Sequence, residues 1–457
     1  MKNKKLKIIT SLLLVSFLVG SGFRCNFITP SEQQALKPIE LTWWGSEDDS
    51  IAYEQMINDY RAQHPHITIV YRKLRKEEFE KELLNALAED RGPDIFTIEN
   101  TLITKYLSKI EPMPAKTKVA YQFVQKTLNI KEEIITEVRE NTSITPPQLK
   151  NAYLDVVYGD VVRDNKIYGL PLYMDTLVMF YNRDLLNNAG IPLPPTNWLS
   201  LQQNVKALTY QDKNGELIQS GAALGSGKNI AYSADILSLL MMQNGAVMTT
   251  GNQVTFGLVP QDINIKNYNP GPEAIRFFTD FSNPSREVYT WNDSFPVSLD
   301  AFAQGRVAMV FGYFSDIKYL EAKRGGKLNY AIAKIPQIEG RPEINFARYS
   351  LNTVSKKSKN INESWDFVQF ISQKNEVEKY LGTTGKPTAL RALVSGQQEN
   401  DGLKTFAEQL LTAKSWYQGR EPETMYQNFN TLIEMVRNGQ PLKDAVELAV
   451  QKIQQTY

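Results

Sequence analysis

Near residue 39 the spacing of apolar residues changes from a strand pattern to a helix pattern. Ile39 to Trp44 form a short, β-rich run that ends at Gly45. After an acidic turn, Tyr53, Met56 and Tyr60 recur at the spacing of one helix face. The acids of the turn lie where they complement the positive end of a helix dipole. The segment therefore predicts a strand that leads into a helix.

The same alternation repeats further along the chain. Ile67 to Tyr71 are apolar and β-branched, a stretch with helical spacing follows, and Asp94 to Ile98 come after the breaker Gly92-Pro93. Strands that alternate with helices in this way predict βαβ units and a mostly parallel sheet. The expected fold class is α/β.

Later segments extend this pattern. Residues 110–147 have a helix-like pattern that ends at the breaker Pro146-Pro147. Further strands are expected within 167–173, 177–181, 302–311 and 349–354. Two terminal helices are expected on either side of Pro441, because apolar stripes run through 425–436 and 442–453.

The first residues have the order of a secretory signal. Four lysines precede an apolar run from Ile8 to Val19, which is followed by small residues. The run is well short of the roughly 20 residues that span a bilayer, so residues 1–24 are expected to be a signal peptide. Cys25 follows directly, and its position resembles that of the acylated cysteine of bacterial lipoproteins. Cleavage after Gly22 and an uncleaved anchor are the alternatives. Residues 25–38 are polar and are expected to form a tether.

Composition narrows the function classes. The 457 residues are about three times the size of a typical domain, so two or three packing units are expected. With a net charge near +1, the chain lacks the strong positive electrostatic field that attracts nucleic acid. Two histidines and one cysteine leave too few soft ligands for a zinc, copper or iron–sulfur site, and no cofactor is expected. Aromatic residues make up 11% of the chain, a surplus that suits a ligand with apolar faces.

Five blocks in a fixed order resemble the extracellular solute-binding proteins of sugar ABC transporters, the maltose-type family. They are LTWWG from Leu41, GPDIF from Gly92, YGLPLYMD from Tyr168 with YNRDLL from Tyr181, GRVAMVFG from Gly305, and WDFVQFI from Trp365. Each block alone is a weak signal, but five in family order are a strong one.

The resemblance implies a two-lobed fold of the type II periplasmic-binding-protein class, in which each lobe is a βα sandwich and the ligand lies between the lobes. It implies a first lobe of 38–175 plus 311–345 and a second of 176–310 plus 349–457. The chain would cross between lobes near 175–177, 311–312 and 348–350. The protein would be a monomer without enzymatic activity that captures a carbohydrate by hinge closure and delivers it to a membrane permease.

A sugar site needs aromatic platforms together with carboxylate, amide or guanidinium groups for the hydroxyls. Candidates at strand ends are Trp44, for which core packing is the alternative, Glu47, for which a helix cap is the alternative, Glu99 and Asn100. Candidates near the implied crossings are Tyr173 and Asp175, for which hinge stabilisation is the alternative, Gly312, for which a turn is the alternative, Tyr313, Arg348 and Tyr349. Candidates in the second lobe are Tyr232, Trp291, Trp416 and Tyr426.

Other functions fit the residues less well. The run Gly221 to Asn229 lacks the Gly-Lys-Ser/Thr spacing of a phosphate-binding loop, and His64 and His66 have no neighbouring acids or cysteine for a metal site. A secreted glycoside hydrolase needs only two suitably spaced carboxyls, which 50 acids do not exclude. A peptide or a glycerol-phosphate ligand within the same fold is the other alternative, and a phosphate would call for a cationic cluster of which Arg348 is the obvious member.

Overall fold

The computed structural model describes residues 36–127, 131–261, 268–323, 325–326 and 328–457. The expected signal peptide, Cys25 and all but the last residues of the expected tether lie outside these ranges. No helix among the described residues is both long and apolar enough to cross a membrane.

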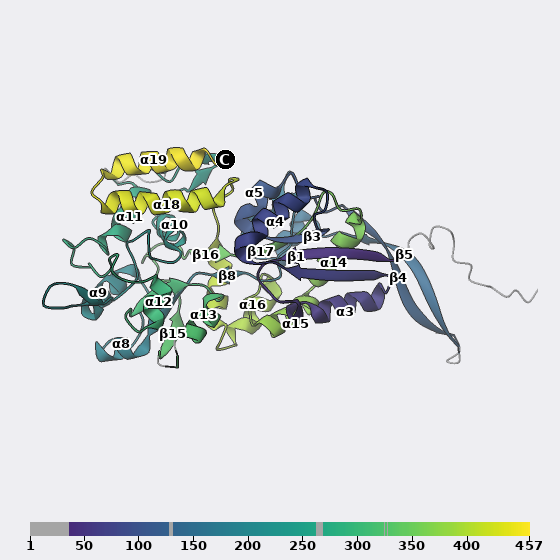
Figure 1. The fold of residues 1–457 in the computed structure, drawn as a ribbon, viewed down its shortest axis with the longest axis horizontal. Helices are drawn as coiled ribbons and strands as arrows, with labels where there is room; N and C mark the ends of the chain where they lie inside the picture. The colour runs from purple at the N-terminus through teal and green to yellow at the C-terminus, as the bar shows by residue number, and fades with distance from the viewer. Residues whose placement is uncertain (1–35, 128–130, 262–267, 324, 327) are drawn as a thin grey trace, which may run out of the picture.

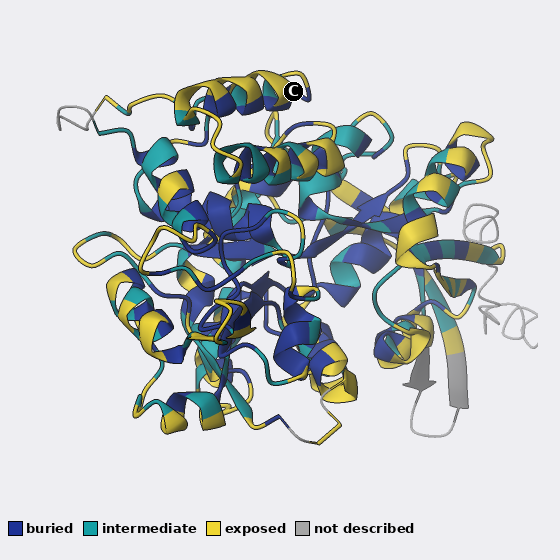
Figure 2. Ribbon diagram, turned by 60° about the vertical axis from the view of Figure 1, so that its left-hand side comes forward, coloured by how far each residue is buried: buried dark blue, intermediate teal, exposed yellow. Residues whose placement is uncertain are grey.

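The chain builds two lobes, each around its own hydrophobic core (Figure 1). The first core draws its buried side chains from 41–174 and 347–413. The second core draws them from 177–346, from Phe406 and from 416–453. Buried residues fill the centre of each lobe, whereas exposed residues lie on the outer faces of the peripheral helices (Figure 2).

The first lobe contains a four-stranded sheet of order β17-β3-β1-β2. The strands β1 (Ile39–Gly45), β2 (Ile67–Lys73) and β3 (Ile95–Glu99) are parallel, and β17 (Ser350–Val354) pairs antiparallel with β3. The helices α3 (Glu54–Gln63) and α4 (Lys76–Ala88) connect the parallel strands, while α14 (Ile361–Ile371) and α15 (Lys374–Thr384) follow β17. The strand–helix alternation and the α/β class expected from the sequence are confirmed here.

The second lobe contains a three-stranded sheet of order β14-β9-β15. The strands β14 (Met309–Gly312) and β15 (Tyr330–Ala333) both pair antiparallel with β9 (Val178–Asn182). The helix α10 (Ser233–Gln243) is buried along its whole length, and α11 (Pro270–Asp280) and α18 (Pro422–Arg437) pack against it. The helix α19 (Leu442–Gln454) packs on α18 and α11.

Three short strands carry the chain between the lobes. In this sheet β16 (Asn345–Arg348) lies between β8 (Asp175–Thr176) and β18 (Ala413–Lys414). Core membership changes between Met174 and Leu177, between Phe346 and Ala347, and again between Ala413 and Trp416. These three passages form the hinge region of the fold.

The lobe assignment implied by the resemblance therefore needs correction after residue 310. Residues 311–345 belong to the second lobe, because β14 and β15 complete its sheet on either side of β9. Most of 349–413 belongs to the first lobe, because β17 extends the first sheet at β3 and the helices after it pack on that sheet. The expected crossing at 311–312 does not exist, and the third passage lies at 413–416 instead.

The helix-like interpretation of 110–147 is also wrong. This segment forms a long hairpin of β4 (Lys116–Thr127) and β5 (Lys131–Thr142) that projects from the first lobe (Figure 1). Thr117 and Val119 are buried whereas Lys116 and Lys118 are exposed, which is the two-residue period of a strand. Pro146 begins a helix rather than ending one, since Thr145 caps that helix in a capping box.

The remaining elements are shorter. They are η1 (Ser50–Ala52), η2 (Asn100–Leu102), α5 (Ile103–Tyr106), α6 (Pro146–Ala152), α7 (Asp155–Val161), β6 (Val162–Arg163), β7 (Lys166–Ile167), α8 (Arg183–Asn188), α9 (Trp198–Leu208), β10 (Tyr210–Gln211), β11 (Leu217–Gln219), β12 (Thr249–Thr250), β13 (Gln253–Val254), α12 (Ser298–Ala303), α13 (Asp316–Lys323), α16 (Arg391–Gln398), α17 (Lys404–Gln409) and η3 (Leu410–Thr412).

Candidate functional site

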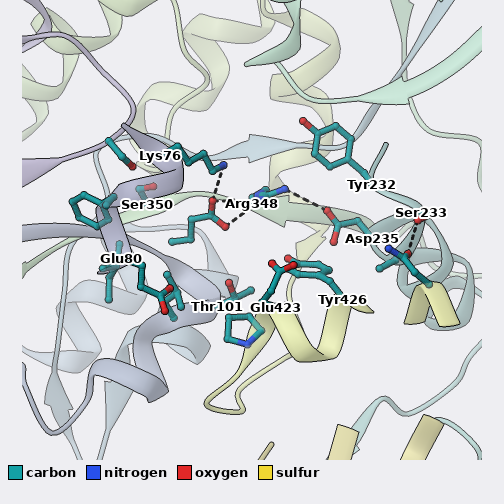
Figure 3. Close-up of a pocket in the computed structure, with 18 of the residues that line it drawn as sticks. Lys76, Glu80, Thr101, Tyr232, Ser233, Asp235, Arg348, Ser350, Glu423 and Tyr426 are labelled. Carbon is teal, nitrogen blue, oxygen red and sulfur yellow. Dashed lines mark hydrogen bonds and ion pairs between the residues drawn. The ribbon is translucent and has the colours of Figure 1, made fainter. Parts of the chain in front are cut away.

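Two adjoining cavities of about 400 and 700 Å³ lie between the lobes. They share five lining residues, which come from the first lobe, from the second lobe and from the hinge strand β16: Ser46, Lys76, Glu99, Tyr232 and Arg348. The two cavities therefore form one cleft with these residues at its centre. Figure 3 shows the smaller cavity.

Arg348 links the two walls of the cleft. It is the last residue of β16, and its Nη2 donates to both carboxylate oxygens of Glu99 in the first lobe, at 2.9 and 3.2 Å. Its Nη1 lies 3.9 Å from Oδ2 of Asp235 in the second lobe. On the other side of Glu99, the Nζ of Lys76 lies 3.0 Å from Oε1 (Figure 3). A chain of alternating charges thus crosses the cleft.

These contacts change the protonation of Glu99. Burial alone would raise its pKa, but the Arg348 guanidinium and the Lys76 ammonium outweigh burial and lower the pKa of Glu99 to about 2. Glu99 is therefore a carboxylate at every physiological pH. It can accept hydrogen bonds but cannot donate them.

The second-lobe wall combines tyrosines with buried carboxylates. Tyr313 donates to Asp235 at 2.8 Å, and Tyr232 donates to Asp316 at 2.9 Å. The rings of Tyr232 and Tyr313 meet edge to face, with centroids 4.8 Å apart. Tyr232 has a φ of 59° at the start of α10, a left-handed conformation that is costly for a tyrosine and is typical of functional sites.

Asp175 fixes the hinge strand β8 to the second lobe. Its buried carboxylate accepts the backbone N–H groups of Phe314 and Ser315 at 3.0 and 3.2 Å, and it lines the larger cavity. Burial raises the pKa of Asp175 to about 7, although the backbone hydrogen bonds oppose this rise. The residue therefore titrates near neutral pH.

The loop after β1 supplies further acceptors on the first-lobe wall. Glu47 accepts hydrogen bonds from the hydroxyls of Tyr173 and Ser350, the latter at 2.7 Å. The Nζ of Lys386 donates to Asp48 at 2.7 Å and lies 3.9 Å from the centre of the Tyr173 ring. This mutual support holds the loop at the mouth of the larger cavity.

The structure thus brings eight of the fourteen candidate residues to the cleft. They are Glu47, Glu99, Tyr173, Asp175, Tyr232, Tyr313, Arg348 and Tyr426. The other six are absent from the described linings of both cavities, and each has a structural environment instead.

The three candidate tryptophans pack elsewhere. Trp44 is half-buried, with the Arg72 guanidinium 4.8 Å from its ring centre. Trp291 is fully buried, and its Nε1 donates to Asn229 at 2.8 Å. Trp416 is buried with its ring centre 5.6 Å from that of Phe429. None of the six tryptophans, all of which are described, lines either cavity.

Asn100, Tyr349 and Gly312 also have packing roles. The amide of Asn100 and the hydroxyl of Tyr349 both donate to the buried Asp160, at 2.9 and 2.6 Å. Gly312 lies directly against the Asp316 carboxylate, since a Cβ there would come within 2.7 Å of Oδ2. Its lack of a side chain lets Asp316 accept the backbone N–H of Tyr313.

Sequence reasoning missed several polar residues of the cleft. Lys76, Asp235, Lys386 and Glu423 line it, but none stands beside an unusual motif. Lys76, Asp235 and Glu423 do share one signal, because each lies in the first turn of a helix that begins at the cleft. The sequence alone does not show which of its helices begin there.

The histidines lie away from the cleft. Nδ1 of the buried His64 is 2.7 Å from the carbonyl oxygen of Ala120 at the base of the hairpin, and its ring stacks on Tyr60. Burial lowers the pKa of both His64 and His66. Across the described residues, no group of three or more histidine, cysteine or acidic side chains is arranged to hold a metal ion.

Comparisons with known proteins identify a family model and relatives that match this chain. Residues 44–376 match the family model described as bacterial extracellular solute-binding protein. The galactooligosaccharide-binding protein of Bacillus subtilis is 22% identical, with 80% of this chain and 76% of that protein covered. A maltooligosaccharide ABC transporter solute-binding lipoprotein of Streptococcus pneumoniae is 24% identical, with 53% of this chain and 54% of that protein covered.

A solved structure shares the fold across nearly the whole chain. The cyclic alpha-maltosyl-1,6-maltose binding protein of Arthrobacter globiformis superposes with a TM-score of 0.70 at 17% identity, covering 92% of this chain and 99% of that one. This confirms the expected two-lobed type of fold.

Proposed function

This chain belongs to the bacterial extracellular solute-binding proteins, and from that premise we propose that it captures a carbohydrate outside the cytoplasmic membrane and delivers it to the permease of an ABC importer. The family and the relatives above are binding proteins rather than enzymes. The proposed role is therefore recognition and release, without a chemical step.

The composition of the cleft carries this proposal. Its walls present carboxylates, a guanidinium and tyrosine hydroxyls from both lobes, and sugar hydroxyls pair with all of these groups. Tyrosine rings at Tyr232 and Tyr426 supply apolar surface for the C–H faces of a sugar. A ligand held by both walls favours the closed arrangement, because only that arrangement allows all of its contacts.

We assign ligand binding to the eight candidates that line the cleft, with Arg348 and Glu99 at its centre. The lobes would close about the hinge strands β8, β16 and β18. Small-angle scattering tests this motion, since the radius of gyration is expected to fall when ligand is added. An unchanged radius at saturating ligand would count against closure.

Ligand screening tests the function itself. A thermal-shift and calorimetry screen of neutral mono- and oligosaccharides is expected to find a stabilising ligand, and a ligand at 100 times its Kd stabilises a protein by about 2.7 kcal/mol. Chromatography of the recovered ligand should show it unchanged. Release of shortened sugar would contradict a pure binding protein and support a hydrolase.

A matched pair of tyrosines provides the control. Tyr426 lines the cleft, whereas Tyr210 is 52% exposed in β10 and lies outside the described linings of both cavities. Tyr426→Leu is expected to weaken sugar binding by about tenfold, through loss of one stacking contact. Tyr210→Leu should leave the affinity as it is.

Export and attachment form the second part of the proposal. The lysine-rich start, the apolar run and Cys25 support a secreted chain held to the membrane by a lipid on Cys25. Mass measurement of the exported protein is expected to show the lipid on an N-terminal cysteine. Cys25→Ser should release the protein from the membrane fraction, and an unlipidated wild-type mass would refute the anchor.

A further inference from the structure

Carboxylates outnumber cations in the smaller cavity. Its lining holds two cations and four acids: Lys76, Arg348, Glu80, Glu99, Asp235 and Glu423. A cleft with an excess of one charge concentrates ligands of the opposite charge, because its low-dielectric walls focus the field. The charge of this cavity therefore bears on which carbohydrates it accepts.

Both cations of the lining are already paired. The Lys76 ammonium lies 3.0 Å from one oxygen of Glu99, and the Arg348 guanidinium lies 2.9 Å from the other. An acidic sugar or a sugar phosphate would have to share both cations with Glu99, which already neutralises them. It would also bring a further negative charge beside Asp235 and Glu423.

Asp235 is in the opposite condition, because it lacks a close positive partner. The residue is 1% exposed, and its one described hydrogen bond comes from the neutral hydroxyl of Tyr313. The Arg348 guanidinium lies 3.9 Å away, beyond hydrogen-bonding distance. Among the described residues nothing donates to its second oxygen, Oδ1. A buried carboxylate in this state is stabilised by any donor that a ligand supplies.

The start of α18 adds a second acid and a ring on the same side. Glu423 and Tyr426 line the cavity near Asp235 and Arg348 (Figure 3). The described hydrogen bond to Glu423 is a long one, 3.4 Å from the amide of Gln427. Carboxylates beside tyrosine rings are the surroundings that an ammonium group prefers, through charge-assisted hydrogen bonds and cation–π attraction.

Building on the proposed function, we propose that the smaller cavity of the cleft selects saccharide units without acidic groups and that a protonated amino substituent on the sugar strengthens binding through Asp235 and Glu423. The excess of carboxylates in the lining also disfavours the alternative of a glycerol-phosphate ligand. Neutral sugars bind through their hydroxyls, and amino sugars gain one ionic contact in addition.

Calorimetry with matched sugars tests this selection. The probes are glucose, glucosamine and glucuronate, their β-1,4-linked trimers, and the galactose, galactosamine and galacturonate set, all at pH 6. The amino form is expected to bind about tenfold more tightly than the neutral form, the scale of one charge-assisted hydrogen bond. The uronic form should bind about tenfold more weakly. Added salt should shrink both differences.

The possible outcomes separate the two claims. If neither these probes nor any sugar of the wider thermal-shift screen binds, the carbohydrate function fails, and the inference fails with it. If uronic forms bind as tightly as neutral ones, or amino forms no more tightly, the selection is overturned while the carbohydrate function stands.

Isosteric variants locate the effect. Asp235→Asn and Glu423→Gln are each expected to reduce the amino-over-neutral affinity ratio from about tenfold to about threefold. Glu423 is exposed, so its replacement leaves folding intact even where Asp235→Asn does not. Glu399→Gln removes the same charge from the exposed end of α16 and should leave the ratio unchanged. A ratio that persists in both cleft variants overturns the assignment.

Discussion

The two walls of the cleft shift the pKa values of their carboxyl groups in opposite directions. On the first-lobe wall, the cations Arg348 and Lys76 outweigh burial and hold the pKa of Glu99 at about 2. On the hinge and second-lobe wall, burial raises the pKa of Asp175 to about 7 and that of Asp235 in the same direction, against hydrogen bonds from neutral donors and, for Asp235, the attraction of Arg348. The carboxylate of the first-lobe wall is already paired with cations, whereas a hydrogen-bond donor on a ligand would stabilise the carboxylates of the other wall.

Arg348 lies between these two environments. It pairs closely with Glu99 and distantly with Asp235, so a change at either wall alters the forces on the same guanidinium. Its place at the end of β16 puts it on a strand that passes between the lobes. The contrast between the walls can therefore be tested by removing each charge in turn.

Removal of the Arg348 charge should have the largest effect. Arg348→Gln leaves Glu99 with Lys76 and removes the guanidinium, the one cation that the described residues pair with Asp235. Loss of one partner of a largely buried pair costs about 3 kcal/mol, and urea unfolding at pH 7 measures it. Lys76→Gln is the matched control, since Lys76 is 63% exposed and should cost well under about 1 kcal/mol. Equal losses in the two variants would contradict the central role of Arg348.

The second prediction concerns pH at the hinge. Because folding raises the pKa of Asp175 to about 7, the folded protein binds this proton more tightly than the unfolded chain. Stability from this residue is therefore fully present below its ordinary pKa of 3.8 and is lost as the pH rises from there through about 7.

Asp175→Asn should remove that dependence. Relative to the variant, the wild-type protein is expected to lose about 2 kcal/mol of unfolding free energy between pH 5 and pH 8. Parallel pH profiles of the two proteins would show that Asp175 is ionised throughout.

The contribution of Glu99 to the free energy of unfolding should depend on pH in the opposite direction. Its pKa is lowered from 4.5 to about 2 by folding, so its contribution is present above pH 4.5 and is lost as the pH falls toward 2. The wild-type protein should lose about 1.5 kcal/mol relative to Glu99→Gln between pH 6 and pH 3, a value reduced for partial exposure. Denaturant unfolding across this range measures it. If Glu99 and Asp175 gave pH profiles of the same sign, the contrast between the walls would be lost.

Local pattern explains what could be predicted of the fold. The run through β1, the acidic turn and α3 carries its own alternation, and so do β2 and β3. The assignment of 311–345 depends instead on pairing between β14, β15 and the distant β9, which no local pattern contains. The hairpin β4–β5 likewise owes its position to packing against α14 and α3 rather than to its helix-like composition.

The site shows the same limit. Glu99 and Arg348 were identified because strand ends and hinges concentrate function. Asp235 was not, since only the position of α10 distinguishes it from the other acids of the chain. Tryptophan is a poor indicator of the site in this chain, because a large aromatic ring suits a core as well as a sugar platform. Trp291 and Trp416 pack in the core of the second lobe.

The smallest expected effect is at Trp44, an aromatic candidate of the first lobe that the structure places outside both cavities. Its ring packs with Arg72 outside both cavities, so Trp44→Leu should change sugar affinity by no more than about twofold. Tyr232→Leu, on the opposite wall, should weaken the same sugar by about tenfold. Calorimetry with one ligand compares the two variants directly. Because stacking on the sugar is expected from Tyr232 and Tyr426 of the second lobe, a tenfold loss at Trp44 would show that the first-lobe wall stacks on the sugar as well.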